Sequence, residues 1–206
     1  MPTKLSWSHI TELMVLSNKD EIEYYIGIVN ERNISYRKLS ELIKDNDYNR
    51  IDEKTKSKLK NNKHLEVKDL IKALIKIKNS NYEIISEKVL QKLILENLND
   101  FLTELGIDFC YVGNEYKIKV GDRYNYIDLL LYNIEFNCYI VIELKITELK
   151  KEHIGQIQVY MNYIDKNIKK FNQNKTIGII ICKKENKFVI EYCSDDRIAV
   201  REYELV

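Results

Sequence analysis

Residues 126–131 (Tyr-Ile-Asp-Leu-Leu-Leu) and residues 139–146 (Tyr-Ile-Val-Ile-Glu-Leu-Lys-Ile) decide the fold of this 206-residue chain. The second stretch is an almost continuous apolar run, which is typical of a central strand that is covered on both faces. Residues 133–137 between the two stretches indicate a turn, so we predict two antiparallel neighbouring strands.

Working outward, a helix is predicted from Ser86 to a stop at Gly106, because its apolar residues fall on one face. A second helix is predicted over residues 151–168. Further strands are predicted over residues 109–112, 116–120, 176–182 and 188–193, with a short edge strand over 199–205. This order of elements predicts an α/β domain with a mixed sheet.

The first half of the chain has a helical pattern, with helices predicted over residues 9–17 and 19–30 and another that begins at Ser35. We therefore predict a helical N-terminal domain over residues 1–50, a connecting helix or linker over 51–84, and the α/β domain over 85–206. Residues 51–80 contain nine lysines and four acidic residues, a net charge of +5. This segment is either a solvated helix face or a nucleic-acid-binding surface, with these candidate contacts: Lys54, Lys56, Lys58 and Lys60.

Composition narrows the function classes. Apolar residues make up 45% of the chain and the formal net charge is +1, so the chain is globular and its overall charge does not select a partner. The four cysteines are widely spaced without a C-x-x-C pair and the three histidines do not cluster, which argues against a zinc site and favours reduced core cysteines. We find no signal peptide and no apolar run of membrane-spanning length, and therefore expect a cytoplasmic protein.

Two charged residues stand in the apolar run of the central strand. Side chains alternate between the faces of a strand, so Glu143 and Lys145 are expected to point the same way. Asp128 interrupts the preceding strand, where it is expected close to Glu143. Buried carboxylates that repel each other favour a divalent cation between them, and hard oxygen ligands suit Mg²⁺. Either these residues form a catalytic site for phosphodiester hydrolysis, with Lys145 beside the attacking water or the phosphate, or they form a structural salt bridge.

Several segments of the chain carry a family resemblance: 5–9, 24–26, 35–43, 101–113, 127–132, 141–145, 155–165 and 177–183. With these segments the chain resembles the YhcG-type family of PD-(D/E)XK nucleases, and the resemblance weakens only across about residues 44–84. It implies a restriction-endonuclease-like mixed β-sheet core flanked by helices and preceded by a small helical N-terminal domain. The implied activity is a metal-dependent endonuclease that acts on DNA with Mg²⁺, for which Mn²⁺ substitutes. The resemblance alone suggests that the chain forms a homodimer.

The resemblance assigns roles to individual residues. Asp128 and Glu143 match the metal-binding acids, and Lys145 matches the catalytic lysine. Gln156 and Tyr160, four residues apart on the following helix, are similar to the pair that lines the site in many of these nucleases. The alternative is that Gln156 and Tyr160 are simply polar residues on the exposed surface of the helix.

One position departs from the family pattern. A further glutamate is often found on the first core helix near Gln91, which is an amide here. Glu87, one turn earlier and near the expected buried edge of the helix, could compensate as an additional metal ligand, so the number of metal ions stays open. The substitution also keeps a second interpretation open: a catalytically inactive nucleic-acid-binding or assembly protein that retains the nuclease fold.

Overall fold

The computed structural model describes residues 4–61, 66–79, 82–106, 108–193 and 195–206. The chain divides into two compact units, Met1–Leu65 and Glu66–Val206. The segment 51–84, predicted as a connection, is shared between the two units. Its residues 74–77 form a strand that pairs within the sheet of the second unit.

The first unit is helical, as its sequence pattern predicts. Ser6, Asn18 and Ser35 cap its first three helices through side-chain oxygens that accept backbone N–H groups. A buried cluster that includes Tyr25, Val29 and Leu39 forms its core. The elements are α1 (Trp7–Leu13), α2 (Lys19–Arg32), α3 (Tyr36–Lys44), the short 3₁₀ helix η1 (Asp47–Arg50) and α4 (Glu53–Lys60).

The second unit contains a six-stranded mixed sheet with the strand order β1-β6-β5-β4-β3-β2. Pairing is antiparallel between β2, β3 and β4 and parallel from β4 through β5 and β6 to β1. The sheet confirms the mixed α/β core predicted from the sequence. Its strands are β1 (Leu74–Ile77), β2 (Phe109–Val120), β3 (Arg123–Asn133), β4 (Cys138–Glu148), β5 (Ile177–Lys184) and β6 (Ile198–Leu205).

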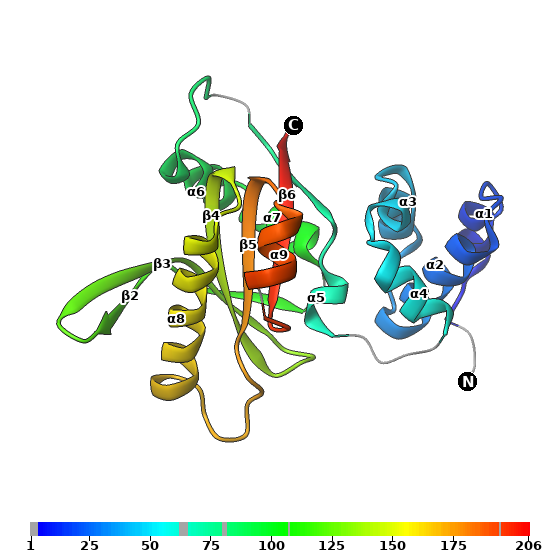
Figure 1. The fold of residues 1–206 in the computed structure, drawn as a ribbon. Coiled ribbons are helices and arrows are strands. Elements are labelled where there is room, and N and C mark those ends of the chain that lie inside the picture. Colours follow the sequence, from blue (N-terminus) through cyan, green and yellow to red (C-terminus); the bar gives the residue numbers. More distant parts are fainter. Residues whose placement is uncertain (1–3, 62–65, 80–81, 107, 194) are drawn as a thin grey trace. The chain divides into compact units, whose positions relative to one another are not determined.

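Helices cover both faces of this sheet (Figure 1). The short helix α5 (Val67–Leu70) precedes β1, and α6 (Glu87–Glu96) and α7 (Leu98–Leu105) pack on one face, over a core that includes Ile142 and Leu144. The helix α8 (Lys151–Asn167) packs on the other face, over Val141 and Ile180. Because β4 is covered on both sides, its nearly continuous apolar sequence is explained.

Close packing of α8 on β5 depends on Gly178. A Cβ atom at that position would lie 2.6 Å from Met161 Sδ and 2.9 Å from Ile157 Cδ1. The missing side chain therefore lets α8 approach the strand.

Three local predictions were wrong. Residues 188–193 were predicted as a strand, but they form α9 (Lys187–Cys193). Asn186 caps the start of this helix, because its Oδ1 accepts the Val189 N–H at 3.2 Å. A strand here would also find no free edge on β5, since β5 already has a strand on each side. The single helix predicted after Ser86 is divided at Asn97 into α6 and α7. The two strands predicted over residues 109–112 and 116–120 are instead one continuous strand, β2, with a bulge at Gly113.

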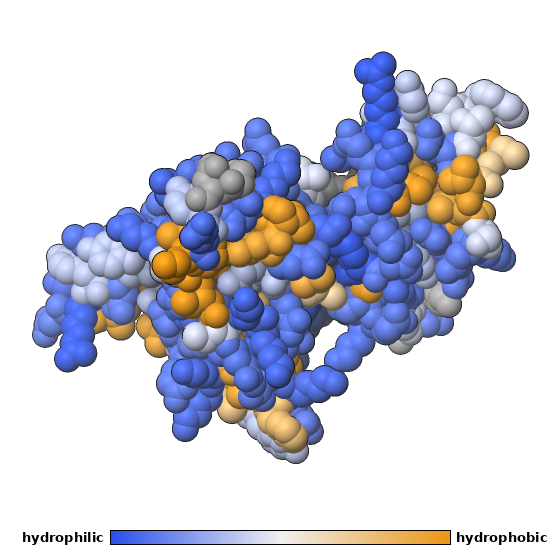
Figure 2. Space-filling model, turned by 90° about the horizontal axis from the view of Figure 1, so that it is seen from above, coloured by the Kyte–Doolittle hydropathy of each residue, from blue (hydrophilic) through white to orange (hydrophobic). Residues whose placement is uncertain are grey.

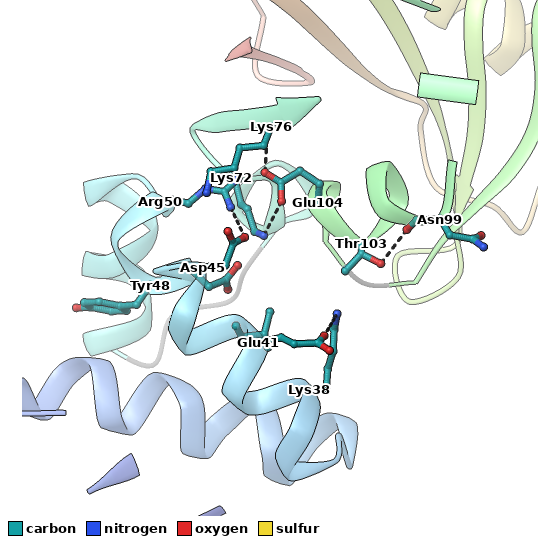
Figure 3. Close-up of polar contacts among 12 residues, drawn as sticks. Lys38, Glu41, Asp45, Tyr48, Arg50, Lys72, Lys76, Asn99, Thr103 and Glu104 are labelled. Carbon is teal, nitrogen blue, oxygen red and sulfur yellow. Dashed lines mark hydrogen bonds and ion pairs between the residues drawn. The ribbon is translucent and has the colours of Figure 1, made fainter. Parts of the chain in front are cut away.

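A buried ion pair joins α7 to the segment that leads into β1 (Figure 3). Lys72 Nζ lies 3.0 Å from Glu104 Oε2, and the Lys76 backbone N–H donates to Glu104 Oε1 at 2.9 Å. Both oxygens of this buried carboxylate are therefore hydrogen-bonded.

The surface seen from above is mostly hydrophilic, with separate apolar patches (Figure 2). Cys138 and Cys182 are buried, as expected of core cysteines, whereas Cys110 and Cys193 are exposed, contrary to that expectation. Among the described residues, no helix combines the length and the apolar character needed to cross a membrane.

Candidate active site

Asp128 lies where β3 and β4 separate. The backbone pairing of the two strands ends at Leu129 and Ile142, one residue short of Asp128. Beyond that point the Asp128 side chain continues the connection, because its Oδ2 accepts the Leu144 backbone N–H at 2.8 Å. This hydrogen bond holds the Asp128 carboxylate against β4, beside Glu143.

Glu143 and Lys145 point to the same side of β4, as the alternation of the strand predicts. Their side chains meet, with Lys145 Nζ 2.9 Å from Glu143 Oε1. Glu143 is only 2% exposed and Lys145 only 8%. The second carboxylate oxygen of Glu143, Oε2, is buried and has no hydrogen-bond partner among the described residues. A buried carboxylate oxygen left in this way is costly unless a further ligand satisfies it.

The electrostatics of the two acids show that their charges interact. Burial raises the pKa of Glu143 to about 7, and the charge of Asp128 adds to the rise while Lys145 opposes it. Burial likewise raises the pKa of Asp128, against the effects of the Leu144 N–H and of Lys145. Burial alone would lower the pKa of Lys145, but Glu143 and the other nearby carboxylates raise it above its ordinary value. The site thus combines one firmly protonated amine with two carboxyl groups that are reluctant to ionise together.

Two residues of α6 reach this end of the sheet. Glu87, which was expected near the buried edge of the helix, is exposed, and its Oε2 lies 3.4 Å from Lys145 Nζ. Gln91 is buried, and its Nε2 donates to the backbone carbonyl of Asp128 at 2.8 Å. An ionised glutamate has no proton to donate in this bond, so the amide at position 91 has a structural role of its own.

The helix α8 contributes the pair that the sequence singled out. Gln156 Nε2 donates to Tyr160 Oη at 2.9 Å, and Tyr160 is buried. Burial raises the pKa of Tyr160, and the charges of Glu143 and Asp128 contribute to the same rise. The phenol therefore lies within electrostatic range of both acids.

Two further residues near the site were missed from the sequence. His153, on α8, has a pKa lowered by burial and by the charge of Lys145. Its spacing of three residues from Gln156, on one helix face, was the available signal. Glu115, on β2, helps to raise the pKa of Asp128. Its neighbours Asn114 and Tyr116 pair with Leu129 and Ile127, which flank Asp128, so only knowledge of that register would have found it.

The acids fit a divalent cation in the kind of atom they offer. Asp128 and Glu143 provide hard carboxylate oxygens, and Glu143 Oε2 is the buried oxygen without a partner. Across the described part of the chain, however, no group of three or more His, Cys, Asp or Glu side chains is arranged to hold a metal ion. Glu87 forms an ion pair with Lys145 and does not form such a group with Asp128 and Glu143.

The lysine-rich helix α4 belongs to the first unit, whereas the acids and Lys145 belong to the second. Lys56 pairs with Glu53 at 2.8 Å and lies over the Tyr48 ring, while Lys54 is exposed. Lys58 is partly buried and has an interaction partner. The Lys60 side chain lies outside the part that is described.

Comparisons with known proteins agree with the nuclease resemblance. A protein of Escherichia coli (strain K12) named "Putative nuclease YhcG" is 29% identical over 97 residues, which cover 47% of this chain and 26% of that protein. The matched region thus spans about a quarter of the length of that relative.

Two solved structures are similar to about three fifths of the chain. A repair endonuclease from Pyrococcus abyssi has a TM-score of 0.39 at 18% identity, covering 60% of this chain and 49% of that one. A structure described as an EndoMS–dsDNA2 complex has a TM-score of 0.40 at 16% identity, covering 62% and 48%. Residues 66–206, which are the whole second unit, match the family described as the YhcG PDDEXK nuclease domain. The chain therefore belongs to the YhcG PDDEXK nuclease family.

Proposed function

We propose that this chain is an endonuclease that hydrolyses phosphodiester bonds in DNA with Mg²⁺, for which Mn²⁺ substitutes. The observation that carries the proposal is the buried Glu143 carboxylate. One of its oxygens binds Lys145, and the other is buried without a hydrogen-bond partner among the described residues, beside Asp128. An apolar strand would not keep this arrangement for stability alone, because burying an incompletely paired carboxylate is unfavourable.

Asp128 and Glu143 are the proposed metal ligands. A divalent cation bound by them would act as a Lewis acid, which activates water and neutralises charge on the phosphate. The Leu144 N–H fixes the Asp128 carboxylate at 2.8 Å and so presets its orientation. We propose Glu87 as an additional ligand only when its interaction with Lys145 is released.

Lys145 and the Gln156–Tyr160 pair are proposed to act on the substrate. The raised pKa of Lys145 keeps its amine charged at neutral pH, so it can stabilise the negative phosphate or orient the attacking water. Tyr160 is held by Gln156, and its hydroxyl can donate to a phosphate oxygen while it accepts from the amide.

A second interpretation, a binding protein without turnover, is favoured by two observations. Gln91 occupies the helix position where the family often has glutamate, and its amide is bonded to the Asp128 carbonyl. In addition, the described residues bring no third carboxylate into a metal-binding group. This interpretation predicts tight nucleic-acid binding without any metal-dependent product.

A cleavage panel separates the two interpretations. Single-stranded DNA, duplex DNA, branched DNA and RNA are each incubated with the unmodified chain in Mg²⁺, Mn²⁺ or EDTA. The nuclease proposal expects products with either metal and none in EDTA. If the chain binds a substrate tightly and cuts none of them, the proposal fails and the binding interpretation stands.

Measuring the mass of the chain in solution would test the homodimer, and locating it in the cell would test our expectation of a cytoplasmic protein.

The lysine-rich segment is proposed as a separate nucleic-acid-binding surface. Lys54, Lys56 and Lys58 are the positions to replace with serine, together with Lys60. If they bind phosphates, binding weakens alike for all sequences and the log–log salt slope flattens by about 0.9 for each duplex phosphate that is no longer bound. An unchanged slope would assign this segment to a solvated helix face.

A further inference from the structure

The strands β2 and β3 extend past the rest of the sheet as a two-stranded arm. Pairing between β3 and β4 covers Leu129–Asn133, whereas pairing between β2 and β3 continues out to Val120 and Arg123. The arm lies at the left edge of Figures 1 and 2. One face of it is covered, because Ile118 and Ile127 are buried in the core under α8.

The opposite face of the arm combines two lysines with two tyrosines. Lys117 is the cross-strand partner of Tyr126, and Lys119 is the partner of Tyr124, so all four side chains share one face. We call them the Lys–Tyr face. Tyr124 is 56% exposed and Tyr126 is 52% exposed, and both lysines are exposed as well.

The two cations of this face interact with a ring rather than with a carboxylate. Lys117 Nζ lies 3.9 Å from the centre of the Tyr124 ring, and Lys119 Nζ lies 6.0 Å from it. Among the described residues, neither lysine forms a salt bridge with Asp or Glu. Both charges are therefore accessible to a polyanion, while the rings offer flat apolar surfaces.

Cross-strand packing within the arm could account for the tyrosines alone, since aromatic pairs stabilise strand pairs. It does not account for two lysines on the same face that have no acidic partner among the described residues. Residues 117–126 contain three basic residues and one acidic residue, so the end of the arm is net positive by two charges. Proteins that bind single-stranded nucleic acid combine cations, which bind the phosphates, with exposed aromatic rings, on which the bases stack. The Lys–Tyr face has both.

The position of the arm relative to the candidate active site supports this ligand. Tyr126 and Tyr124 lie two and four residues from Asp128 on the same strand. At about 3.3 Å per strand residue, these separations are roughly 7 and 13 Å. Successive nucleotides of a stacked strand are about 3.4 Å apart, so along β3 the two rings lie roughly two to four nucleotides from Asp128.

We propose that the Lys–Tyr face holds an unpaired nucleic-acid strand next to the bond that is cut. Lys117 and Lys119 bind its phosphates, and bases stack on Tyr124 and Tyr126. The inference rests on the proposed nuclease function and adds to it a substrate with a single-stranded segment beside the scissile phosphate.

Binding measurements in EDTA test the face apart from cleavage. The probes are a fluorescent 12-nucleotide single strand and a 20-base-pair duplex, titrated with the full chain. Tyr124→Ser with Tyr126→Ser should weaken single-strand binding about tenfold per stacked base, and the duplex less. The corresponding double Phe variant keeps the rings and should bind as the unmodified chain does. Lys117→Ser with Lys119→Ser should reduce the single-strand salt slope by about 0.7 for each phosphate that is no longer bound.

The matched control is Lys166→Ser with Phe171→Ser, which removes an exposed lysine and a fully exposed aromatic ring near the end of α8. It should leave both affinities unchanged. The proposal is overturned if the control and the arm variants bind alike, if the Phe variant binds as weakly as the Ser variant, or if the chain binds neither probe. It is also overturned if the arm variants change only the mass of the chain in solution, since the face would then join two copies. Weakened binding by the arm variants of a chain that cuts nothing would support the face while rejecting the nuclease proposal.

Discussion

Two buried Lys–Glu pairs in the second unit differ in how completely they are satisfied. In the pair between Lys72 and Glu104, both carboxylate oxygens are hydrogen-bonded, one by the amine and the other by the Lys76 backbone N–H (Figure 3). In the pair between Lys145 and Glu143, only one carboxylate oxygen is bonded within the described part of the chain. The separations of the paired atoms are nearly equal, at 3.0 and 2.9 Å.

The difference shows which of the two pairs is suited to structure and which to chemistry. A buried pair in which every oxygen is bonded gains nothing from a further ligand. A buried carboxylate with one oxygen left over, and a second acid nearby, gains a great deal from a cation. The distance within a pair therefore reveals less about function than the partner of its remaining oxygen.

The largest expected effect is on stability, in the Lys72–Glu104 pair. Lys72→Ala removes the amine that bonds Oε2 of the buried Glu104 carboxylate and should lower the free energy of unfolding by about 3–5 kcal/mol. Lys145→Ala should cost less than half as much, because Glu143, with a pKa of about 7, can take up a proton instead. Urea unfolding at pH 7, followed by circular dichroism, measures both. Equal losses would remove the distinction between the pairs.

The loss of cleavage activity should rank the two lysines in the reverse order, with Lys145 above Lys72. Lys145→Ala removes the cation and leaves both proposed metal ligands, so metal binding should survive while cleavage falls about 10²-fold or more. Asp128→Asn removes a ligand charge, so metal affinity and cleavage should fall together. Lys72→Met is the matched control: in the temperature range where it is folded, it should cut at the unmodified rate. Normal cleavage by Lys145→Ala would exclude a catalytic role for this amine.

Much of this contrast could be predicted from the sequence, because the charges of β4 stand out against an apolar strand. The alternation of side chains placed Glu143 and Lys145 on one face, and the short turn placed Asp128 on the neighbouring strand. The Lys72–Glu104 pair could not be predicted in this way. Its members lie 32 residues apart, in segments without a pattern that links them.

The local errors have a common cause, which is that tertiary contacts override short sequence patterns. Residues 188–193 are rich in β-branched and aromatic residues, which favours a strand. In the structure β5 is flanked by β4 and β6, and Val189 and Ile190 instead pack as part of a helix. The role of Gln91 was likewise hidden. Its position suggested a lost ligand, and only the structure shows its bond to the Asp128 carbonyl.

The next effect is the pH dependence of stability without added metal. The pKa of Glu143 is raised by folding from an ordinary 4.5 to about 7, so the folded state holds its proton more tightly than the unfolded state does. The stability this provides is complete below the unfolded pKa and is lost as the pH rises through the folded pKa. Between pH 5 and pH 8 the loss should be about 2 kcal/mol. Glu143→Gln should lack this loss, and Glu104→Gln should retain it; parallel pH profiles for the unmodified chain and Glu143→Gln would contradict the assignment.

The smallest expected effect concerns Gln91, whose amide donates to the backbone carbonyl of Asp128 beside the incompletely satisfied site. Gln91→Met has a similar volume and no donor, so it should lower the free energy of unfolding by about 1 kcal/mol, with or without Mg²⁺. Gln91→Glu loses the same hydrogen bond and adds a negative charge near Asp128. It should therefore be less stable than Gln91→Met in EDTA and should recover with Mg²⁺ if the new carboxylate binds the ion. Thermal unfolding of both variants in EDTA and in Mg²⁺ measures the difference. Recovery accompanied by faster cleavage would show that the amide had cost the site a ligand. Recovery by both variants alike would instead mean that position 91 does not reach the metal, and that its amide serves only to hold β3 in place.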